Sequence, residues 1–473
     1  MPKKPVILAL SAAIAIVVAS MWLLRPPSAS AIAGPQSVLD VDAASIVSFE
    51  TRAADGTTST IERTLTGWQL AGRGSPPWAV QEGRARAAAR ILADLQGRPV
   101  DDADLPPVAS TLTLTDARGR TMSLGLREPV VGGRRVVDRI DDQGNVQRFA
   151  IDEPLYEAFV RTGLEAWRNE GLLGALPGRP ARVEMARGES RLDLARVEGR
   201  WSLRSPVATR ANEQSVDNLL RAVAQLRVER FDEPAPPAVQ AQQPVTITIE
   251  ADRSEPGEED GRPIRITERV TLSLHGPADT GGRLTLVGVS RERERRQAGA
   301  SAEDLGTAYV AVDLEPLQEV TLEPRGYVAP QALEGDASLV TTLSLDDRVY
   351  ARSGDGWSEA DEALPPDRTA ALDAIATLLT TTAMTGVELT ATPQPMGRAS
   401  RGVRVQAATI TGDPLTPSDG LVMRVVEAPG GASGALIIGD GVTREYIDAA
   451  STAAARAALV LSEPGASEPV GDQ

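Results

Sequence analysis

The sequence contains no cysteine and a single histidine, His275. The lack of cysteine excludes disulfide bonds, thiolate chemistry and zinc sites built on thiolates. With one histidine as well, we expect no transition-metal site, since such sites draw mainly on imidazole and thiolate ligands. His275 stands at the end of an alternating segment, and the chain has no G-x-S-x-G motif. A surface position is therefore expected for His275, rather than the role of a general base.

Aromatic residues and lysines are also scarce. Aromatic residues make up 3% of the chain and hydrophobic residues 42%, so the cores must be built mainly from Ala, Val, Leu and Ile. The only lysines are Lys3 and Lys4, and the formal net charge is −16. An acidic protein is repelled by phosphate backbones, so nucleic-acid binding is not expected. A length of 473 residues suits about three domains.

One long apolar segment is present, at residues 5–24, between the two lysines and Arg25. About 20 apolar residues can span a bilayer, and the positive flank stays on the cytoplasmic side. This predicts a retained signal-anchor, with residues 1–31 forming a cytoplasmic stub, a transmembrane helix and a linker. The protein would then be a single-pass inner-membrane protein whose body is periplasmic. The alternative is a cleaved signal peptide, because residues 29–31 (Ala-Ser-Ala) resemble a cleavage site.

The most informative pattern occurs three times along the chain. A short alternating stretch leads to a Gly and a Trp, and a helical stripe of apolar residues with i, i+3, i+4, i+7 spacing follows. Recurrence of this kind predicts copies of one structural unit. We expect its core to contain the three tryptophans and one residue from each stripe, namely Trp68, Trp201, Trp357, Leu92, Leu220 and Ile375. The alternative is that the tryptophans are exposed platforms for a ligand.

These repeats predict an α+β fold, with tandem antiparallel β-sheets each packed on a helix, behind the N-terminal transmembrane helix. The third repeat departs from the pattern, because Glu359 stands where Leu70 and Leu203 stand in the others. We expect helices at residues 80–96, 153–168, 212–227, 366–382 and 446–461. The expected units are residues 38–178, 179–330 and 331–462, followed by a disordered tail at 463–473.

Several polar or glycine-rich segments could hold a ligand but are explained more simply. Residues 291–296 alternate Arg and Glu, which is typical of an exposed loop or helix, with a protein-contact patch as the alternative. Trp78 lies outside the repeat, and we expect it at the surface. Turns or solvated loops account for Glu255, Glu258, Glu259 and Asp260, for Asp141, Asp142 and Asn145, and for the glycines from Gly430 and Gly431 to Gly441. No metal ion or cofactor is therefore expected.

The chain resembles a bacterial family known as domain of unknown function 4340. The resemblance rests on the apolar N-terminal segment, the Gly-Trp-x-Leu step at residues 67–70, Leu124-Gly125 and the segment 166–173. It covers residues 40–235 best and weakens over the third repeat. The resemblance implies a membrane-anchored envelope protein, often encoded beside ABC-type exporter and gliding-motility-type components. The family supplies no catalytic residues to carry over.

We therefore expect a non-catalytic envelope protein that acts as a scaffold or binding accessory of an ABC-type transport complex. Its expected partners are the cytoplasmic membrane, through residues 5–24, and a membrane or envelope protein. The alternative is a carboxylate-dependent hydrolase that acts on envelope glycan. Such an enzyme would need two carboxylates about 5–10 Å apart in a cleft, at least one of them with a raised pKa.

Overall fold

The computed structural model describes most of the chain from Gly34 to Glu463. The described residues are 34–64, 67–72, 75–100, 105–128, 135–140, 144–151, 159, 165–173, 179–237, 244–256, 263–295, 302–321, 323–354, 356–389, 398–399, 401–409, 415–416, 420–427 and 433–463.

Strands dominate the described residues, with 53% in strands and 20% in helices. The expected α+β class is therefore wrong, and the protein is mostly antiparallel β. The sequence patterns underestimated the strands most in the second repeat, where four neighbouring strands are each between 11 and 15 residues long. The described α-helices are α2 (Glu82–Ala93), α4 (Glu213–Gln225), α5 (Pro366–Thr380) and α6 (Ala449–Leu461).

The membrane anchor expected at residues 5–24 lies outside the described residues. In the part of the chain that the structure does describe, no helix has the length and apolar character needed to cross a bilayer. The transmembrane helix in the predicted fold and the single-pass inner-membrane location therefore find no support here, and neither is retained.

The strands form three antiparallel sheets, and the chain divides into two compact units on either side of the Asn169–Glu170 bond. The first unit contains one sheet. Its order is β1 (Gln36–Ser37), β6 (Gln96–Pro99), β10 (Val146–Ile151), β9 (Arg135–Ile140), β8 (Thr121–Arg127), β7 (Val108–Asp116), β2 (Ile46–Ala53), β3 (Thr58–Thr64), β4 (Gly67–Gly72) and β5 (Ser75–Ala79).

The second unit contains the other two sheets. The second sheet has the order β14 (Thr209–Arg210), β13 (Arg200–Ser205), β12 (Ser190–Val197), β11 (Arg179–Arg187), β16 (Val245–Pro256), β17 (Pro263–Pro277), β18 (Leu284–Arg295), β19 (Glu303–Asp313) and β15 (Val228–Arg230). The third has the order β23 (Glu362–Ala363), β22 (Gly356–Glu359), β21 (Arg348–Ser353), β20 (Thr342–Leu345), β26 (Val403–Ala408), β27 (Leu421–Glu427), β28 (Ser433–Gly439), β29 (Val442–Tyr446) and β24 (Gly386–Glu388), with β25 (Arg398–Ala399) paired to β27.

All three sheets share one topology. Four consecutive strands form a meander, a helix follows, and the next strand lies on the opposite side of the sheet, at the edge in the second and third sheets and beside the short edge strand β1 in the first. A second four-strand meander then fills the space between, and its first strand pairs with the first strand of the repeat, as in β2–β7, β11–β16 and β20–β26. The repeat seen in the sequence is thus a repeat of a complete antiparallel sheet domain. The residue numbers at which the domains divide stay a prediction.

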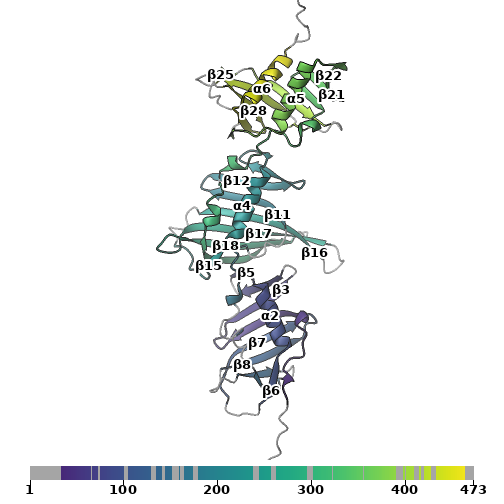
Figure 1. Cartoon of the computed structure of the whole chain (residues 1–473). Coiled ribbons are helices and arrows are strands. Elements are labelled where there is room, and N and C mark those ends of the chain that lie inside the picture. The colour runs from purple at the N-terminus through teal and green to yellow at the C-terminus, as the bar shows by residue number, and fades with distance from the viewer. Residues whose placement is uncertain are drawn as a thin grey trace, which may run out of the picture. The chain divides into compact units, whose positions relative to one another are not determined.

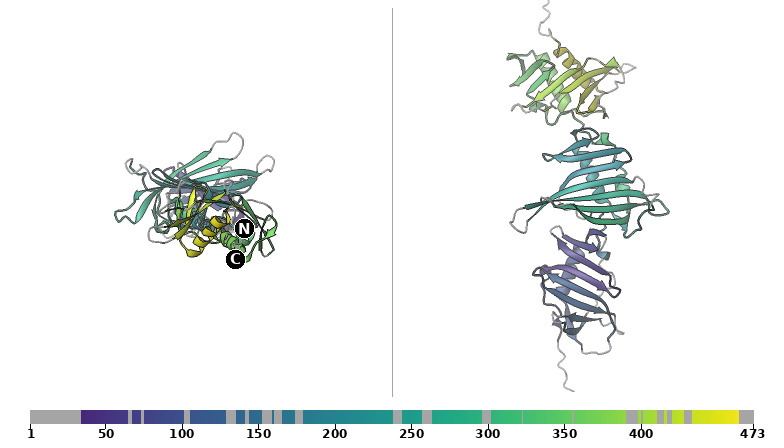
Figure 2. Two further views of the ribbon diagram at one scale, coloured as in Figure 1. Left: turned by 90° about the horizontal axis from the view of Figure 1, so that it is seen from above. Right: turned by 180° about the vertical axis from the view of Figure 1, so that it is seen from behind.

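One face of each sheet is covered by its helix. In Figure 1 helices α2, α4 and α5 lie in front of their sheets, and the reverse view in Figure 2 shows the strands in front. The covered face carries the apolar core, for example Phe49 and Leu112 in the first repeat. Helix α2 turns Ala88 and Leu92 toward that core. No α-helix of the described residues lies on the opposite face of these sheets.

The same backbone hydrogen bond joins sheet and helix in each repeat. The residue before the helix N-cap donates its N–H to the carbonyl oxygen of the repeat's tryptophan. The three bonds run from Val80 to Trp68 (2.9 Å), from Ala211 to Trp201 (3.1 Å) and from Leu364 to Trp357 (2.9 Å). The start of each helix is therefore fixed to the strand that carries the tryptophan.

A second recurring bond fixes the other end of the helix. The segment that leads into each repeat donates a backbone N–H to a leucine carbonyl close to the end of the helix. These bonds run from Val38 to Leu95 (2.9 Å), from Leu172 to Leu226 (3.0 Å) and from Leu333 to Leu379 (2.7 Å). Each helix is thus held by backbone contacts at both ends.

The segment that leaves the first repeat returns to the residues before α2. The N–H of Gln81 donates to the carbonyl of Trp167 (2.8 Å), and the N–H of Asn169 donates to the carbonyl of Ala79 (2.7 Å). This forms a short antiparallel bridge within the first unit. The indole N–H of Trp78 also donates to the carbonyl of Asn169 (2.8 Å). Trp78 is only 3% exposed, so the expected surface position is wrong.

The second repeat has an equivalent bridge. The N–H of Asn212 donates to the carbonyl of Tyr327 (2.7 Å), and the N–H of Ala329 donates to the carbonyl of Arg210 (3.0 Å). In the third repeat Pro365 occupies the position of Gln81 and Asn212, directly after the residue bonded to the tryptophan. Pro365 also serves as the N-cap of α5.

The four described α-helices lie within the expected ranges, and their ends differ from the expected ends by no more than three residues. Helix α4 begins after Asn212, whose side chain accepts a hydrogen bond from the N–H of Ser215 (3.3 Å). Helix α6 begins after Asp448. Of the helix expected at residues 153–168, the described residues are Phe159, the short 3-10 turn Glu165–Trp167 and Arg168. The expected tail lies outside the described residues except for Glu463.

Asp448 provides a test of how α6 is held. Its carboxylate accepts hydrogen bonds from the hydroxyl and the backbone N–H of Ser451, and these bonds lower the pKa of Asp448. At pH 7 we expect Asp448→Ala to lower the free energy of unfolding by about 1 kcal/mol in urea denaturation. Because the folded-state pKa is lowered, this contribution is present above the unfolded-state pKa of about 3.9 and is lost as the pH falls through the folded-state value.

Asp448→Asn is the matched control, because asparagine caps a helix as well as aspartate but does not titrate. It should keep most of the stability at pH 7 and show a weaker acid dependence than the unmodified protein. Equal losses for the alanine and asparagine variants at pH 7 would contradict the capping role.

Candidate binding sites

The three repeat tryptophans lie inside the cores. Trp68, Trp201 and Trp357 are 5%, 2% and 2% exposed. The Trp68 ring stacks on Phe49, with 5.1 Å between the ring centroids. An exposed stacking platform needs an open ring face, and rings this deeply buried do not offer one. The structure therefore places the tryptophans where a packing role is expected.

Arginines lie over two of the indole rings. The guanidinium of Arg196 is 5.0 Å from the ring centre of Trp201, and that of Arg352 is 4.7 Å from the ring centre of Trp357. These distances are within the range of cation–π attraction. The indole N–H of Trp357 also donates to Asp373 on α5 (2.9 Å), so this ring is held to the helix by a polar contact as well.

The three stripe residues are not equally placed. Leu92 and Ile375 are fully buried, whereas Leu220 is half-buried. Helix α4 turns Val216, Leu219, Ala222 and Val223 toward its sheet, which leaves Leu220 at the border of the buried stripe. The periodicity identified the helix, but the residue at the centre of its buried face is Leu219.

Glu359 makes the third repeat different in chemistry as well as in sequence. Its carboxylate accepts two hydrogen bonds from Arg348, at 2.6 and 3.0 Å. Arg348 also donates to the carbonyl of Leu461, at the end of α6 (3.1 Å). Where the other repeats have a buried leucine, the third has a bidentate ion pair that also holds α6.

His275 lies within β17 and is half-buried, not at the surface as expected. Its ring centroid is 6.1 Å from that of Tyr309. Its Nδ1 has no hydrogen-bond partner among the described residues, so no described carboxylate orients the ring in the way that a general base requires.

The Arg-Glu run is a strand and not an exposed loop or helix. Residues up to Arg295 belong to β18, and Arg291 is only 5% exposed. Burial lowers the pKa of Arg291 to about 10. Alternation of Arg and Glu has a period of two, which in a strand sends the two residue types to opposite faces. The expected exposed loop or helix was therefore the wrong interpretation of a pattern typical of a strand.

Most of the weaker candidates lie outside the described residues. This applies to Glu258, Glu259, Asp260, Asp141, Asp142, Gly430 and Gly431, and the side chain of Glu255 is not described. Asn145 is exposed beside β10, and Gly441 occupies a turn with a positive φ of 67°. Across the described ranges, no group of three or more His, Asp or Glu side chains is arranged to hold a metal ion.

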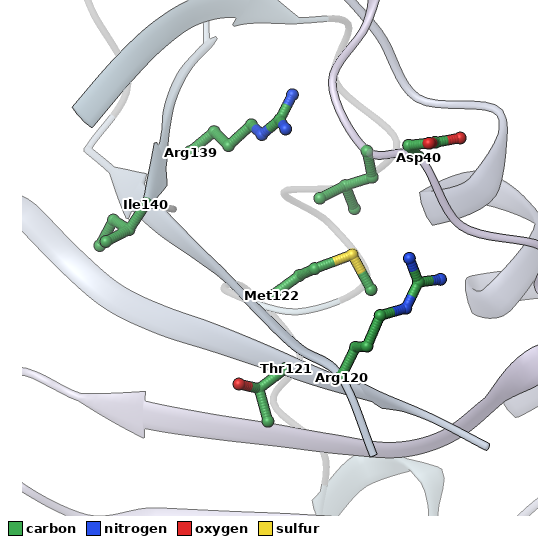
Figure 3. A pocket seen from close by; sticks show the side chains of 7 residues that line it. Asp40, Arg120, Thr121, Met122, Arg139 and Ile140 are labelled. Carbon is green, nitrogen blue, oxygen red and sulfur yellow. The ribbon is translucent and has the colours of Figure 1, made fainter. Parts of the chain in front are cut away.

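A pocket of about 220 Å³ lies at one end of the first sheet. Figure 3 shows Met122 in the middle of the pocket, with Arg120, Arg139 and Asp40 around it. The guanidinium of Arg120 is held by the carboxylate of Asp116 (2.7 Å). The side chains of Arg139 and Asp40 make no hydrogen bond or ion pair with any described residue. A small molecule with both charges would find partners here, but Asp40 is exposed to solvent.

A network of ion pairs covers part of the second sheet, and we call this part the charged face. Arg182 donates to Asp193 through two bonds of 2.9 Å and also pairs with Glu184. Arg269 donates to Glu250 (2.7 Å). The carboxylates of Asp193 and Glu250 raise the pKa of Arg182 and Arg269 respectively, by accepting these hydrogen bonds.

The charged face extends over five adjacent strands, from β12 to β18. Arg269 reaches Glu292 on β18 (2.9 Å), and Arg182 lies directly across from Glu250 in the sheet. Directly opposed residues share one face of an antiparallel pair. Their neighbours along the strands, such as Val183 and Ile249, are buried on the other face, on which α4 lies. The ion pairs therefore cover the face without a helix.

Comparison with known protein families, curated proteins and solved structures found no match.

Leu92 and Leu220 provide a matched test of the repeat core. Leu92→Ala should lower the free energy of unfolding by about 2–5 kcal/mol, because the lost side chain is fully buried. Leu220→Ala should cost clearly less, under about 2 kcal/mol, since a half-buried site relaxes into solvent. Urea denaturation followed by tryptophan fluorescence measures both, with each unfolding transition fitted separately. Equal losses would show that Leu220 is as central to its core as Leu92.

Proposed function

We propose that this chain is a non-catalytic binding or scaffold protein that holds a protein partner on the charged face of its second sheet. The observation that carries the proposal is the distribution of side chains in the repeats. The residues that recur in all three repeats, above all the tryptophans, are in the cores. The second repeat adds long strands and an organised charged surface on its uncovered face.

The geometry of the charged face supports binding to another protein. The ion pairs hold Arg182 and Arg269 in defined positions before any partner arrives, so little side-chain entropy remains to be lost on association. Alternating positive and negative groups attract a partner with the complementary pattern and repel one with like charges in register. Arginine is also enriched at protein interfaces, because its planar group makes several hydrogen bonds at once.

The same network weighs against the glycan hydrolase. Glu250 and Glu292 both bind Arg269, and Glu184 and Asp193 both bind Arg182. A glycosidase instead needs two carboxylates that face a sugar from opposite sides of a cleft. The pocket of the first sheet is lined by a single acid, Asp40. We therefore favour a binding role over a catalytic one.

The class of partner comes from the family resemblance. That resemblance implies an accessory role beside ABC-type exporter components. We propose that the charged face binds a subunit of such a transport complex. Membrane anchoring through residues 5–24 forms no part of this proposal. A partner with its own alternating charges would suit the face best.

The test is cross-linking in the native cell with a photoreactive residue in place of Thr271, which lies on the charged face between β16 and β18. We expect a cross-link to a transport-complex subunit, identified by mass spectrometry. Arg269→Glu should reduce the cross-link at least tenfold. Arg221→Glu, on the exposed side of α4, changes the same charge away from the face and should leave the cross-link intact.

A variant with the charges of Glu250, Arg269 and Glu292 inverted distinguishes a loss of binding from a loss of folding. The triple variant E250R/R269E/E292R restores opposite charges among these three residues but leaves a like charge across from Arg182. It should therefore regain part of the thermal stability that Arg269→Glu loses, while its cross-link stays lost. Loss of the cross-link in R221E to the same degree, or its survival in both charged-face variants, would overturn the proposal.

A further inference from the structure

The second unit buries an arginine with an unused donor. Arg444 on β29 is 1% exposed. Its Nε donates to the carbonyl of Ala329 and its Nη2 to the hydroxyl of Thr209, both at 3.3 Å. Its Nη1 has no partner among the described residues. A buried guanidinium left partly unsatisfied is costly, so this donor calls for a physical explanation.

Two further donors near Arg444 lack partners. Tyr446, two residues along the same strand, is fully buried, and its hydroxyl bonds to no described residue. Arg210 donates from Nη2 to the carbonyl of Gln331 (3.1 Å), but its buried Nε is also unsatisfied within the described part of the chain. Arg444 bonds to Thr209, the residue before Arg210, and to the carbonyl of Ala329, whose own N–H donates to the carbonyl of Arg210. The Tyr446 hydroxyl lies within electrostatic range of both guanidinium groups. Three unused donors therefore belong to one small region.

The charges of this region do not balance. Three guanidinium groups gather here, those of Arg200, Arg210 and Arg444, with two carboxylates, those of Glu334 and Asp440. Glu334 is shared between Arg200 and Arg210. One positive charge is left over. Burial also raises the pKa of Asp440, which weakens the negative side further.

We propose that one monovalent inorganic anion of about chloride size binds at this place, accepting hydrogen bonds from Arg444 Nη1, Arg210 Nε and the Tyr446 hydroxyl. The anion satisfies the three donors and neutralises the excess charge together. A water molecule would satisfy donors but leave the charge. Burial raises the pKa of Tyr446 to about 12, so its hydroxyl keeps its proton and remains a donor beside the anion.

The bound anion would also stabilise the contact between the second and third sheets within the second unit. Thr209 and Arg210 belong to β14 of the second sheet, whereas Arg444 and Tyr446 belong to β29 of the third. The anion would therefore bind donors from both sheets. Occupancy should stabilise the contact between them, since a ligand that binds the folded state raises its stability by mass action.

The direct test is a crystal structure of the full chain grown in sodium bromide, with data collected at the bromine absorption edge. We expect an anomalous peak in contact with Arg444, Arg210 and Tyr446. No peak at this place, with an ordered water there or nothing, would overturn the proposal.

The solution test follows the melting temperature as chloride replaces gluconate at constant ionic strength. The unmodified protein should gain several degrees with chloride, and Tyr446→Phe should lose most of this gain, because it removes one donor but keeps the ring. Tyr350→Phe is the matched control, since Tyr350 is a buried tyrosine of the same repeat whose hydroxyl donates to Leu461 (2.9 Å). It should lower the melting temperature but keep the chloride dependence.

The bromide crystal and the chloride-dependent melting temperature are interpreted together. A bromide peak with an unchanged chloride dependence in Tyr446→Phe would mean an adventitious ion only, and this would overturn the proposal. The absence of any chloride dependence in the unmodified protein would do the same.

Discussion

The hydrogen bond from the residue before the N-cap of each repeat's helix to the carbonyl of the repeat tryptophan is the contact on which the domain design depends. The helix has to cross the sheet, because the strand that follows it lies at the opposite edge or, in the first sheet, next to it. A helix held only by apolar contacts could slide along the sheet, since hydrophobic attraction has little direction. The backbone bond fixes its starting point, and the buried indole supplies the area on which it packs.

Each repeat completes this shared frame with different chemistry. The first fills its core with aromatic rings, including Phe49, Phe159 and Trp167. The second lengthens its central strands and pairs charges on the uncovered face. The third replaces a leucine with the Arg348–Glu359 pair and packs α6 against α5. The frame tolerates these changes because it rests on backbone bonds, which do not depend on side-chain identity.

The sequence predicted what depends on local pattern. The spacing of apolar residues located α2, α4 and α5, and the recurrence of tryptophan identified the number of sheets. Buried Trp68, Trp201 and Trp357 are what that pattern favoured, although Leu220 showed that a stripe of four apolar residues does not reveal its own centre. The errors arose where a strand carried charges. The run from Arg291 was interpreted by composition, although its period of two was typical of a strand.

What remained beyond the sequence depends on contacts between distant residues. The hydrogen bond between Gln81 and Trp167 joins positions far apart in the chain, and no local sequence pattern near either residue predicts it. The charged face exists only because the register sets Arg182 opposite Glu250 and Glu250 opposite Arg269. A shift of one residue would send these groups into the core. For the same reason the grouping of Arg210 with Arg444 could not be foreseen.

Pro365 has a consequence for how such domains can be joined. In each of the first two repeats, the segment that leaves the repeat pairs with the residues before the helix through two backbone hydrogen bonds. One of the two is donated by Gln81 or Asn212. Proline has no N–H to donate, so the third repeat can form at most half of that pair. A tandem duplication of the second repeat would therefore create a matched junction with both bonds, whereas a copy appended after the third would meet a mismatched one.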